Sequence, residues 1–502
     1  MDSFKRPRRL EIDGDRITRV ADAARFQLCV NGREISLPEG AIILPGLVDA
    51  HCHLIGPGQM AEMLDLRGCR SVDEVARMVG EEVRARGGSD WITGFGWNQE
   101  SWPSRDDVTH ATLDAVAPDT PVALYRIDTH ALWMNGAALR RAGIDSRTID
   151  DDGGLIARDA SGAPTGLVYE EMVKEVGAMM PAPSAERIAA WYRHGIAECV
   201  RHGLTSVHDM TVHPDWLGPL VAIAEGGEMR VKARLFLDGT EERWRAVPRP
   251  AMLGENLEAV GVKYFADGAL GSRGAWLLEP YADAPETRGI ATMSSEELID
   301  AARAPIEAGY AVATHAIGDA AVREVLDAYT MLRERYPHAL LRLEHAQNVH
   351  PDDIPRFAAL NVIPSVQPIH CTSDAAMAEA RLGIARCANA YPWRALRDAG
   401  MPLIAGSDFP IESSDPLLGL RAFVERSDAR GAWFAEQAIT RDEAIDAYTT
   451  WVPAGLPGER SEGALREGYA ADITIVSGDP FDDVDACAMM TIVGGERVFS
   501  AG

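Results

Sequence analysis

Eight short apolar runs, separated by stretches long enough for a helix, restrict the fold of this chain more than any other feature. The runs are rich in β-branched residues and are bounded by turn-forming residues, which indicates β-strands. They span residues 46–51, 204–209, 231–237, 260–265, 310–315, 341–345, 361–367 and 402–407. Helix-like stretches between them include residues 294–308, 319–336, 351–360 and 393–399. Because strands of a parallel sheet are buried on both faces, this alternation predicts an α/β fold of the (β/α)8 TIM-barrel type.

The barrel is expected to occupy residues 46–454, with two departures from the alternation. Residues 55–190 separate the first two predicted strands by far more than a connecting loop needs, which predicts an inserted lobe at the barrel mouth. Residues 1–45 and 455–502 alternate apolar and polar residues around Asp-Gly, Asn-Gly and Gly-Gly turns. That pattern predicts a small β-sandwich formed from both chain termini.

The charge of the chain restricts its partners. Its 502 residues carry a formal net charge of −27, spread along the sequence, which argues against nucleic acid or an anionic membrane as a partner. The N-terminus lacks an apolar signal segment and no run reaches about 18 apolar residues, so we expect a cytoplasmic protein. Seven cysteines without framework spacing fit reduced thiols. We expect a small-molecule amide substrate as partner and a homodimer as the candidate assembly.

Four histidines lie at the ends of predicted strands. His51 and His53 are two residues apart on one strand, so both project to the same face and can reach one ion. His315 and His345 close two further runs, at the barrel end where catalytic sites form. A single histidine is more often a hydrogen-bonded core residue, so the metal-site prediction depends on all four together.

Lys263 and Asp408 complete the candidate metal site. Lys263 ends a buried apolar run, where its charge is costly unless it is paired or removed. Carboxylation by CO₂ would make it an anionic bridge between two ions; the alternative is a salt bridge to Asp267 or Asp408. Asp408 follows Gly-Ser at the end of the eighth run, where a carboxylate can bind metal and accept a proton from water. Its alternative role is a helix cap or turn.

These residues, with several longer phrases, resemble the amidohydrolase superfamily, and more closely its YtcJ-like and N-substituted formamide deformylase-like branch. The phrases include GFGWNQESWP, RIDTHALWMNGAAL, FADGALGSRGAW and EGALREGYAADITIVSGDP. The resemblance runs over nearly the whole chain and implies catalytic roles for Asp408, Lys263 and His345. The metal ligands that it implies are His51, His53, Lys263, His315, His345 and Asp408.

The resemblance implies a metal-dependent hydrolase that cleaves the C–N bond of an N-substituted amide, of the formamide or N-acyl type, by a metal-bridging hydroxide. The expected cofactors are two divalent ions, zinc first with Mn²⁺ or Fe²⁺ as alternatives, together with CO₂-derived carboxylation of Lys263. One alternative is a deaminase with a single metal ion, which would not need Lys263. Another is a catalytically silent barrel scaffold, which would be expected to have lost ligands.

Candidate substrate contacts come from the insertion and from loops after the strands. They are Trp97, Asn98, Arg126, His130, Glu170, Asp267, Arg273 and Gln367. The alternatives are structural: Trp97 can be aromatic core, and the two arginines can pair with structural carboxylates. The insertion is expected to form a wall of the substrate pocket, since small-molecule sites combine apolar walls with a few polar groups.

Overall fold

The computed structural model describes residues 2–87, 91–99, 102, 108–127, 131–149 and 154–501. The chain divides into two compact units. One consists of Met1–Pro57 with Ile188–Gly502, and the other of Gly58–Arg187. The second unit is therefore an insertion within the first, and it begins shortly after the first strand of the predicted barrel.

The larger unit contains the eight predicted strands, in chain order and all parallel. They are β6 (Leu47–Cys52), β13 (Leu204–Val212), β14 (Lys232–Asp238), β16 (Leu257–Phe265), β17 (Ala311–Ala316), β18 (Leu341–His345), β19 (Val362–Val366) and β20 (Ile404–Ala405). Hydrogen bonding follows the order β20-β19-β18-β17-β16-β14-β13-β6. The predicted (β/α)8 barrel is confirmed, although β20 is shorter than its predicted run.

The barrel closes between β20 and β6 through the residues just after β20. The Asp408 backbone N–H donates to the His51 carbonyl at 2.7 Å, and the His53 N–H donates to the Phe409 carbonyl at 2.9 Å. A Cβ on Gly406 would lie 2.4 Å from the His51 backbone nitrogen, so only glycine permits this approach. The seam of the barrel therefore joins two of the predicted metal-binding segments directly.

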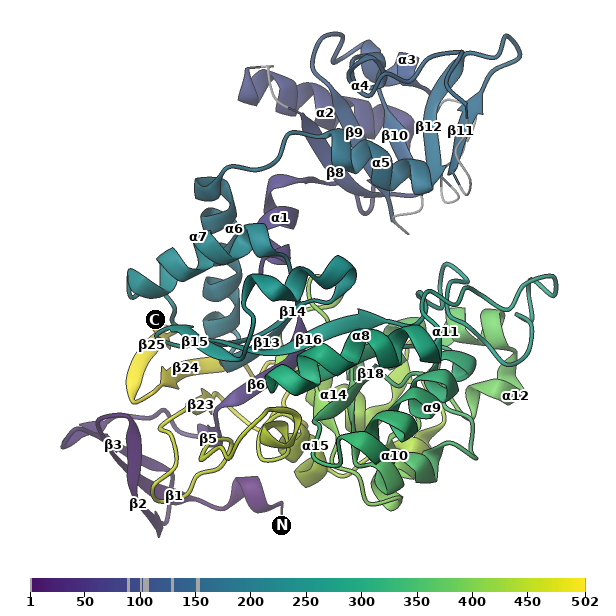
Figure 1. Cartoon of the computed structure of the whole chain (residues 1–502). Helices are drawn as coiled ribbons and strands as arrows, with labels where there is room; N and C mark the ends of the chain where they lie inside the picture. The colour runs from purple at the N-terminus through teal and green to yellow at the C-terminus, as the bar shows by residue number, and fades with distance from the viewer. Residues whose placement is uncertain are drawn as a thin grey trace. The chain divides into compact units, whose positions relative to one another are not determined.

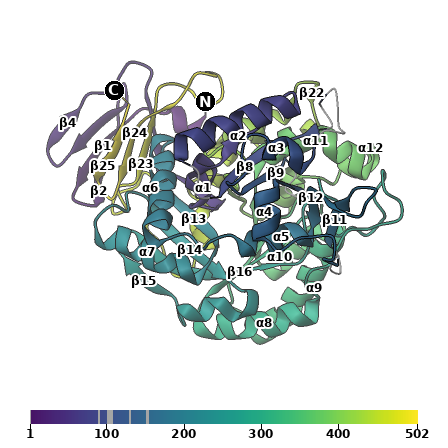
Figure 2. The same ribbon diagram turned by 90° about the horizontal axis from the view of Figure 1, so that it is seen from above.

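Helices cover the outside of the strands, as Figure 2 shows for α7, α8 and α9. Their apolar faces and the strands share one large hydrophobic core. A capping box between Ser294 and Glu297 starts α8, which fixes its first turn. The helices of this unit after the insertion are α6 (Ala185–Arg201), α7 (Pro214–Glu225), α8 (Ser295–Ala308), α9 (Asp319–Arg335), α10 (Ile354–Leu360), α11 (Pro368–Leu382), α12 (Ile384–Cys387), α13 (Trp393–Asp398), α14 (Pro416–Glu425) and α15 (Arg441–Ala447).

Both chain ends form β-sheet, drawn in purple and yellow in Figure 1. The N-terminal sheet has the order β2-β1-β3-β4, and the second sheet has the order β25-β24-β23-β5. Leu10, Ile43, Ile473 and Ile492 belong to one hydrophobic cluster that draws on both sheets. The strands are β1 (Arg8–Asp13), β2 (Arg16–Asp22), β3 (Gln27–Val30), β4 (Arg33–Ile35), β5 (Ile42–Pro45), β23 (Ile473–Val476), β24 (Ala488–Val493) and β25 (Glu496–Ser500).

The inserted unit has a six-stranded sheet in the order β11-β12-β10-β9-β8-β7 and hydrophobic clusters of its own. Its strands are β7 (Leu64–Asp65), β8 (Ile92–Trp97), β9 (Val122–Arg126), β10 (Ala131–Met134), β11 (Gly154–Arg158) and β12 (Pro164–Glu170). Its helices are α2 (Val72–Arg86), α3 (His110–Asp114), α4 (Gly136–Arg141) and α5 (Glu171–Met179). The insertion is therefore a folded unit with its own core.

All seven cysteines are free thiols. Cys52, between the two first-strand histidines, is buried and donates its thiol to the His208 carbonyl, away from the metal-binding face. Among the described helices, none has the length and apolarity that crossing a membrane requires.

Candidate metal centre

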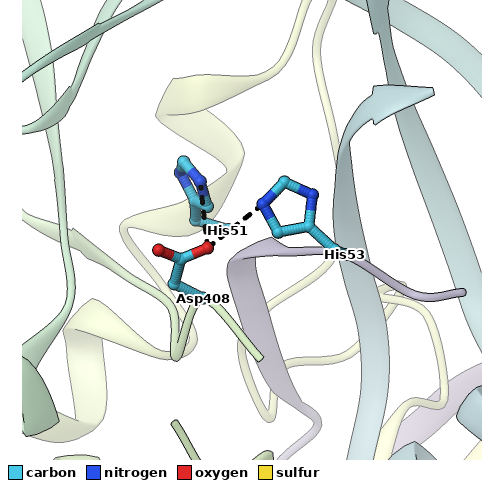
Figure 3. A group of neighbouring side chains, drawn as sticks. All are labelled: His51, His53 and Asp408. Carbon is cyan, nitrogen blue, oxygen red and sulfur yellow. Dashed lines mark ion pairs between the residues drawn. The ribbon is translucent and has the colours of Figure 1, made fainter. Parts of the chain in front are cut away.

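His51 near the end of β6 and His53 just after it converge on Asp408 (Figure 3). The Nε2 atom of His53 lies 3.2 Å from Asp408 Oδ1, and the Nε2 atom of His51 lies 3.7 Å from the same oxygen. One ligand atom from each of the three residues falls within 4.8 Å of the others. Imidazole nitrogen and carboxylate oxygen are ligands that zinc and similar divalent ions accept.

A second group lies next to the first and shares Asp408. It consists of His345, His370 and Asp408, again with ligand atoms within 4.8 Å. The His345 ring centroid lies 4.4 Å from that of His315 and 4.8 Å from that of His51. Within the described chain, His315 Nε2, His345 Nδ1 and His370 Nε2 are buried without a hydrogen bond. Because buried polar atoms are normally paired, these nitrogens fit an added ligand such as a metal ion.

Lys263 lies on β16 with only 1% of its surface exposed. Its Nζ atom is 4.9 Å from the centroid of the Phe265 ring, and no carboxylate in the described chain lies within ion-pair distance. The alternative prediction, a salt bridge to Asp267 or Asp408, therefore finds no support. Burial lowers the pKa of Lys263 to about 8, although the charges of Glu344 and Asp408 oppose this shift. The amine is thus closer to its neutral, nucleophilic form than an exposed lysine is.

Electrostatics favour metal-binding protonation states. Burial lowers the pKa of His51 to about 4 and that of His345 well below its usual range, so both rings are neutral, the form that binds metal. Burial raises the pKa of Asp408, but the hydrogen bond to His53 and the interactions with the surrounding histidines outweigh it, and the net pKa lies well below the usual range. His53 differs, because the hydrogen bond to Asp408 and its charge outweigh burial and raise the pKa of His53. The site therefore presents neutral imidazoles at His51 and His345 beside an ionised carboxylate.

Two of these residues have left-handed backbone conformations. The φ angle is +73° at His345 and +60° at Asp408, a region that non-glycine residues adopt at a cost of about 1–3 kcal/mol. Asp49 helps to hold this geometry, because its carboxylate accepts from the His51 N–H and from the Ser407 hydroxyl at 2.6 Å. Strain of this kind persists where surrounding contacts fix the backbone.

Sequence analysis missed three residues of this region: His370, Glu344 and Arg342. His370 lies in the first turn of α11, directly after β19, and its Nε2 is 4.0 Å from Asp408 Oδ2. The same strand-end reasoning applied to QPIHC would have found it. Arg342 and Glu344 are fully buried on β18. Two charged residues at i and i+2 in LRLEH were the available signal, since such positions share one face of a strand.

The predicted substrate contacts in the insertion have mixed placements. Trp97 is completely buried and donates its indole N–H to the Leu124 carbonyl at 2.7 Å, so it belongs to the core of the inserted unit. Asn98 and Arg126 each have an interaction partner. His130 and the side chain of Glu170 lie outside the described residues.

The three predicted contacts in the barrel also differ. Asp267 accepts the backbone N–H groups of Trp276, Ile317 and Gly318 at 2.7 to 3.0 Å, and so fixes two loops. Arg273 pairs with Asp283 at 2.7 Å. These contacts favour structural roles for Asp267 and Arg273. Gln367, directly after β19, is buried, and its Nε2 makes no hydrogen bond with the described residues; its role as a substrate contact stays a prediction.

A parallel barrel whose strand ends gather imidazoles, a buried lysine and a shared carboxylate has the architecture of a metal-dependent hydrolase. Residues 38–499 match the Amidohydrolase family, and the chain belongs to that family. It is therefore a hydrolase that acts on carbon–nitrogen bonds, and its family implies a divalent metal ion.

Individual relatives agree with this assignment. YtcJ of Bacillus subtilis (strain 168), an amidohydrolase by name, is 37% identical over 93% of this chain and 90% of its own length. The N-substituted formamide deformylase of Arthrobacter pascens is 28% identical over 88% of this chain and 84% of its own. The crystal structure of a metal-dependent hydrolase from Pyrococcus horikoshii OT3 is similar with a TM-score of 0.76 and 25% identity, covering 95% of this chain and 98% of that one.

Proposed function

We propose that this enzyme hydrolyses the C–N bond of an N-substituted amide, of the formamide or N-acyl type, at a centre of two divalent ions bridged by carboxylated Lys263. The observation that carries the proposal is the buried Lys263, without a carboxylate partner in the described chain, beside two histidine groups that share Asp408. The formamide deformylase among the relatives supports the substrate class.

In this proposal, His51, His53 and Asp408 hold one ion, and His315 and His345 hold the other. Divalent ions supply Lewis acidity, which polarises a carbonyl group and makes water more acidic. Zinc is the first expectation from the imidazole and carboxylate donors, with Mn²⁺ or Fe²⁺ as alternatives.

Asp408 is the proposed proton carrier. Its carboxylate accepts a proton from the water that attacks the carbonyl carbon, and passes this proton to the nitrogen as the C–N bond breaks. The transfer matters because an amide anion is a poor leaving group. His53 holds Asp408 Oδ1 at 3.2 Å, while Oδ2 faces His370, so the carboxylate is kept in one orientation.

The test combines metal analysis with a substrate panel. The purified enzyme should contain nearly two ions per chain and hydrolyse one or more N-formyl, N-acyl, carbamate or cyclic-amide substrates. Lys263→Ala should lose most metal and activity, with partial recovery in short carboxylic acids that replace the bridge. Lys232→Ala is the matched control, since Lys232 lies on the neighbouring strand β14 and pairs with Asp472. A fully active Lys263→Ala variant with two ions would refute the bridge, and one ion per wild-type chain would favour a deaminase.

A further inference from the structure

An arginine and a glutamate are buried on β18 next to His51, one of the predicted metal ligands. Arg342 and Glu344 are both 0% exposed and pair through Arg342 Nε and Glu344 Oε1 at 2.8 Å. Arg342 Nη2 also donates to Glu344 Oε2 at 3.1 Å. Buried ion pairs seldom add net stability over apolar residues, so their presence calls for another role.

Glu344 is also hydrogen bonded to a metal-binding histidine. The Nδ1–H of His51 donates to Glu344 Oε2 at 2.6 Å, a short distance typical of a charge-assisted bond. With the proton on Nδ1, the lone pair of His51 lies on Nε2, the atom that faces Asp408 at 3.7 Å. The carboxylate thus determines which nitrogen of His51 is free to bind metal.

We propose that Glu344, anchored by Arg342, is a positioning residue of the metal centre, which orients His51 and fixes its tautomer for metal binding. This inference rests on the proposed function only in taking His51 as a ligand. A ligating histidine commonly donates its second N–H to a carboxylate, and this bond makes the ring a stronger ligand.

Arg342 holds the carboxylate through contacts with several strands. Its Nη2 donates to the Ala50 carbonyl at 2.8 Å and to the Ser365 hydroxyl at 3.1 Å, and its Nη1 lies 2.9 Å from His208 Nδ1. These partners come from β6, β19 and β13, so the guanidinium spans the barrel interior. Glu344 therefore cannot rotate away from His51 without breaking this network.

The other histidine of the pair is held differently. His53 Nδ1 lies 3.2 Å from the Met210 carbonyl oxygen, a neutral and therefore weaker acceptor than a carboxylate. The Nδ1 atoms of His51 and His53 thus have hydrogen-bond acceptors of different strength. Loss of the Glu344 charge should weaken metal binding through His51 while His53 remains in place.

The experiment measures metal affinity of the full-length, metal-free enzyme with Zn²⁺ against a competing chromophoric chelator. Glu344→Gln keeps the side-chain shape but removes the charge, and we expect it to bind Zn²⁺ about 10- to 100-fold more weakly. Glu258→Gln is the matched control. Glu258 is a barrel carboxylate paired with Arg234 and Arg460 that contacts none of the predicted ligands, so this variant should bind Zn²⁺ like the wild type.

A second variant covers the case in which Glu344→Gln does not fold. Arg342→Met with Glu344→Leu replaces both charges by apolar groups, a change that buried pairs often tolerate. Wild-type Zn²⁺ affinity in either folded variant would overturn the positioning role while leaving the proposed reaction intact. A wild-type enzyme that binds no Zn²⁺ would overturn both.

Discussion

Replacing Lys263 by methionine should stabilise the metal-free protein at neutral pH. The ammonium is 1% exposed, and methionine has a similar length without the charge. Burial lowers the pKa of Lys263 from 10.5 to about 8. This shift of about 2.5 pH units, at about 1.4 kcal/mol per unit, corresponds to roughly 3 kcal/mol of destabilisation in the wild type.

The pH dependence of this difference follows from proton linkage. The folded state holds the Lys263 proton less tightly than the unfolded state, so between pH 8 and 10.5 the unfolded chain binds more protons and this contribution to stability rises with pH. The free energy of unfolding of the wild type is therefore lower than that of Lys263→Met by the whole amount below about pH 8, and this difference disappears above about pH 10.5. Burial also raises the pKa values of thiols and phenols such as Cys52 and Tyr329, but their contributions cancel in the difference between the two proteins.

The assay is urea unfolding followed by tryptophan fluorescence, with chelator-treated proteins in bicarbonate-free buffer from pH 7 upward. The measured quantity is the difference in free energy of unfolding between Lys263→Met and wild type. Lys5→Met is the control, because the hydrogen bond to Asp479 raises the pKa of Lys5 from 10.5, so its effect should stay constant up to about pH 10.5. A Lys263→Met difference that does not change with pH would refute the reasoning.

Two further substitutions test the site and the inserted unit. Asp408→Asn should keep the fold and much of the metal while kcat falls by roughly 10²- to 10⁴-fold, since asparagine can offer an oxygen ligand but cannot carry the proton. A kcat near that of the wild type, with normal metal content, would assign proton transfer to another group. Trp97→Ala should destabilise the inserted unit by about 3–5 kcal/mol, because the indole is fully buried against Trp102 and Trp133. Near-UV circular dichroism and urea unfolding measure this loss of stability. The control Trp97→Phe should lose less stability. An unchanged unfolding midpoint for Trp97→Ala would contradict the prediction.

The sequence determined the barrel because its signals are local. Each strand is an apolar run bounded by turn residues, and a parallel barrel repeats this pattern eight times. The order of strands and helices along the chain could therefore be predicted. The histidine pair at 51 and 53, Lys263 and Asp408 were found in the same way, because barrel sites form where strands end. In the structure, His53 Nε2 lies 3.2 Å from Asp408 Oδ1, while metal binding by these residues stays a prediction.

Other features depended on residues far apart in sequence. The bond between Glu344 and His51 joins positions 293 residues apart, and no local pattern predicts which buried carboxylate meets which imidazole. The core role of Trp97 likewise depends on a six-stranded sheet whose mixed parallel and antiparallel pairing leaves no single periodicity in the sequence. Local sequence thus set where the predicted ligands lie along the chain. Tertiary packing decided how each side chain is oriented and charged, because burial and long-range partners exist only in the folded chain.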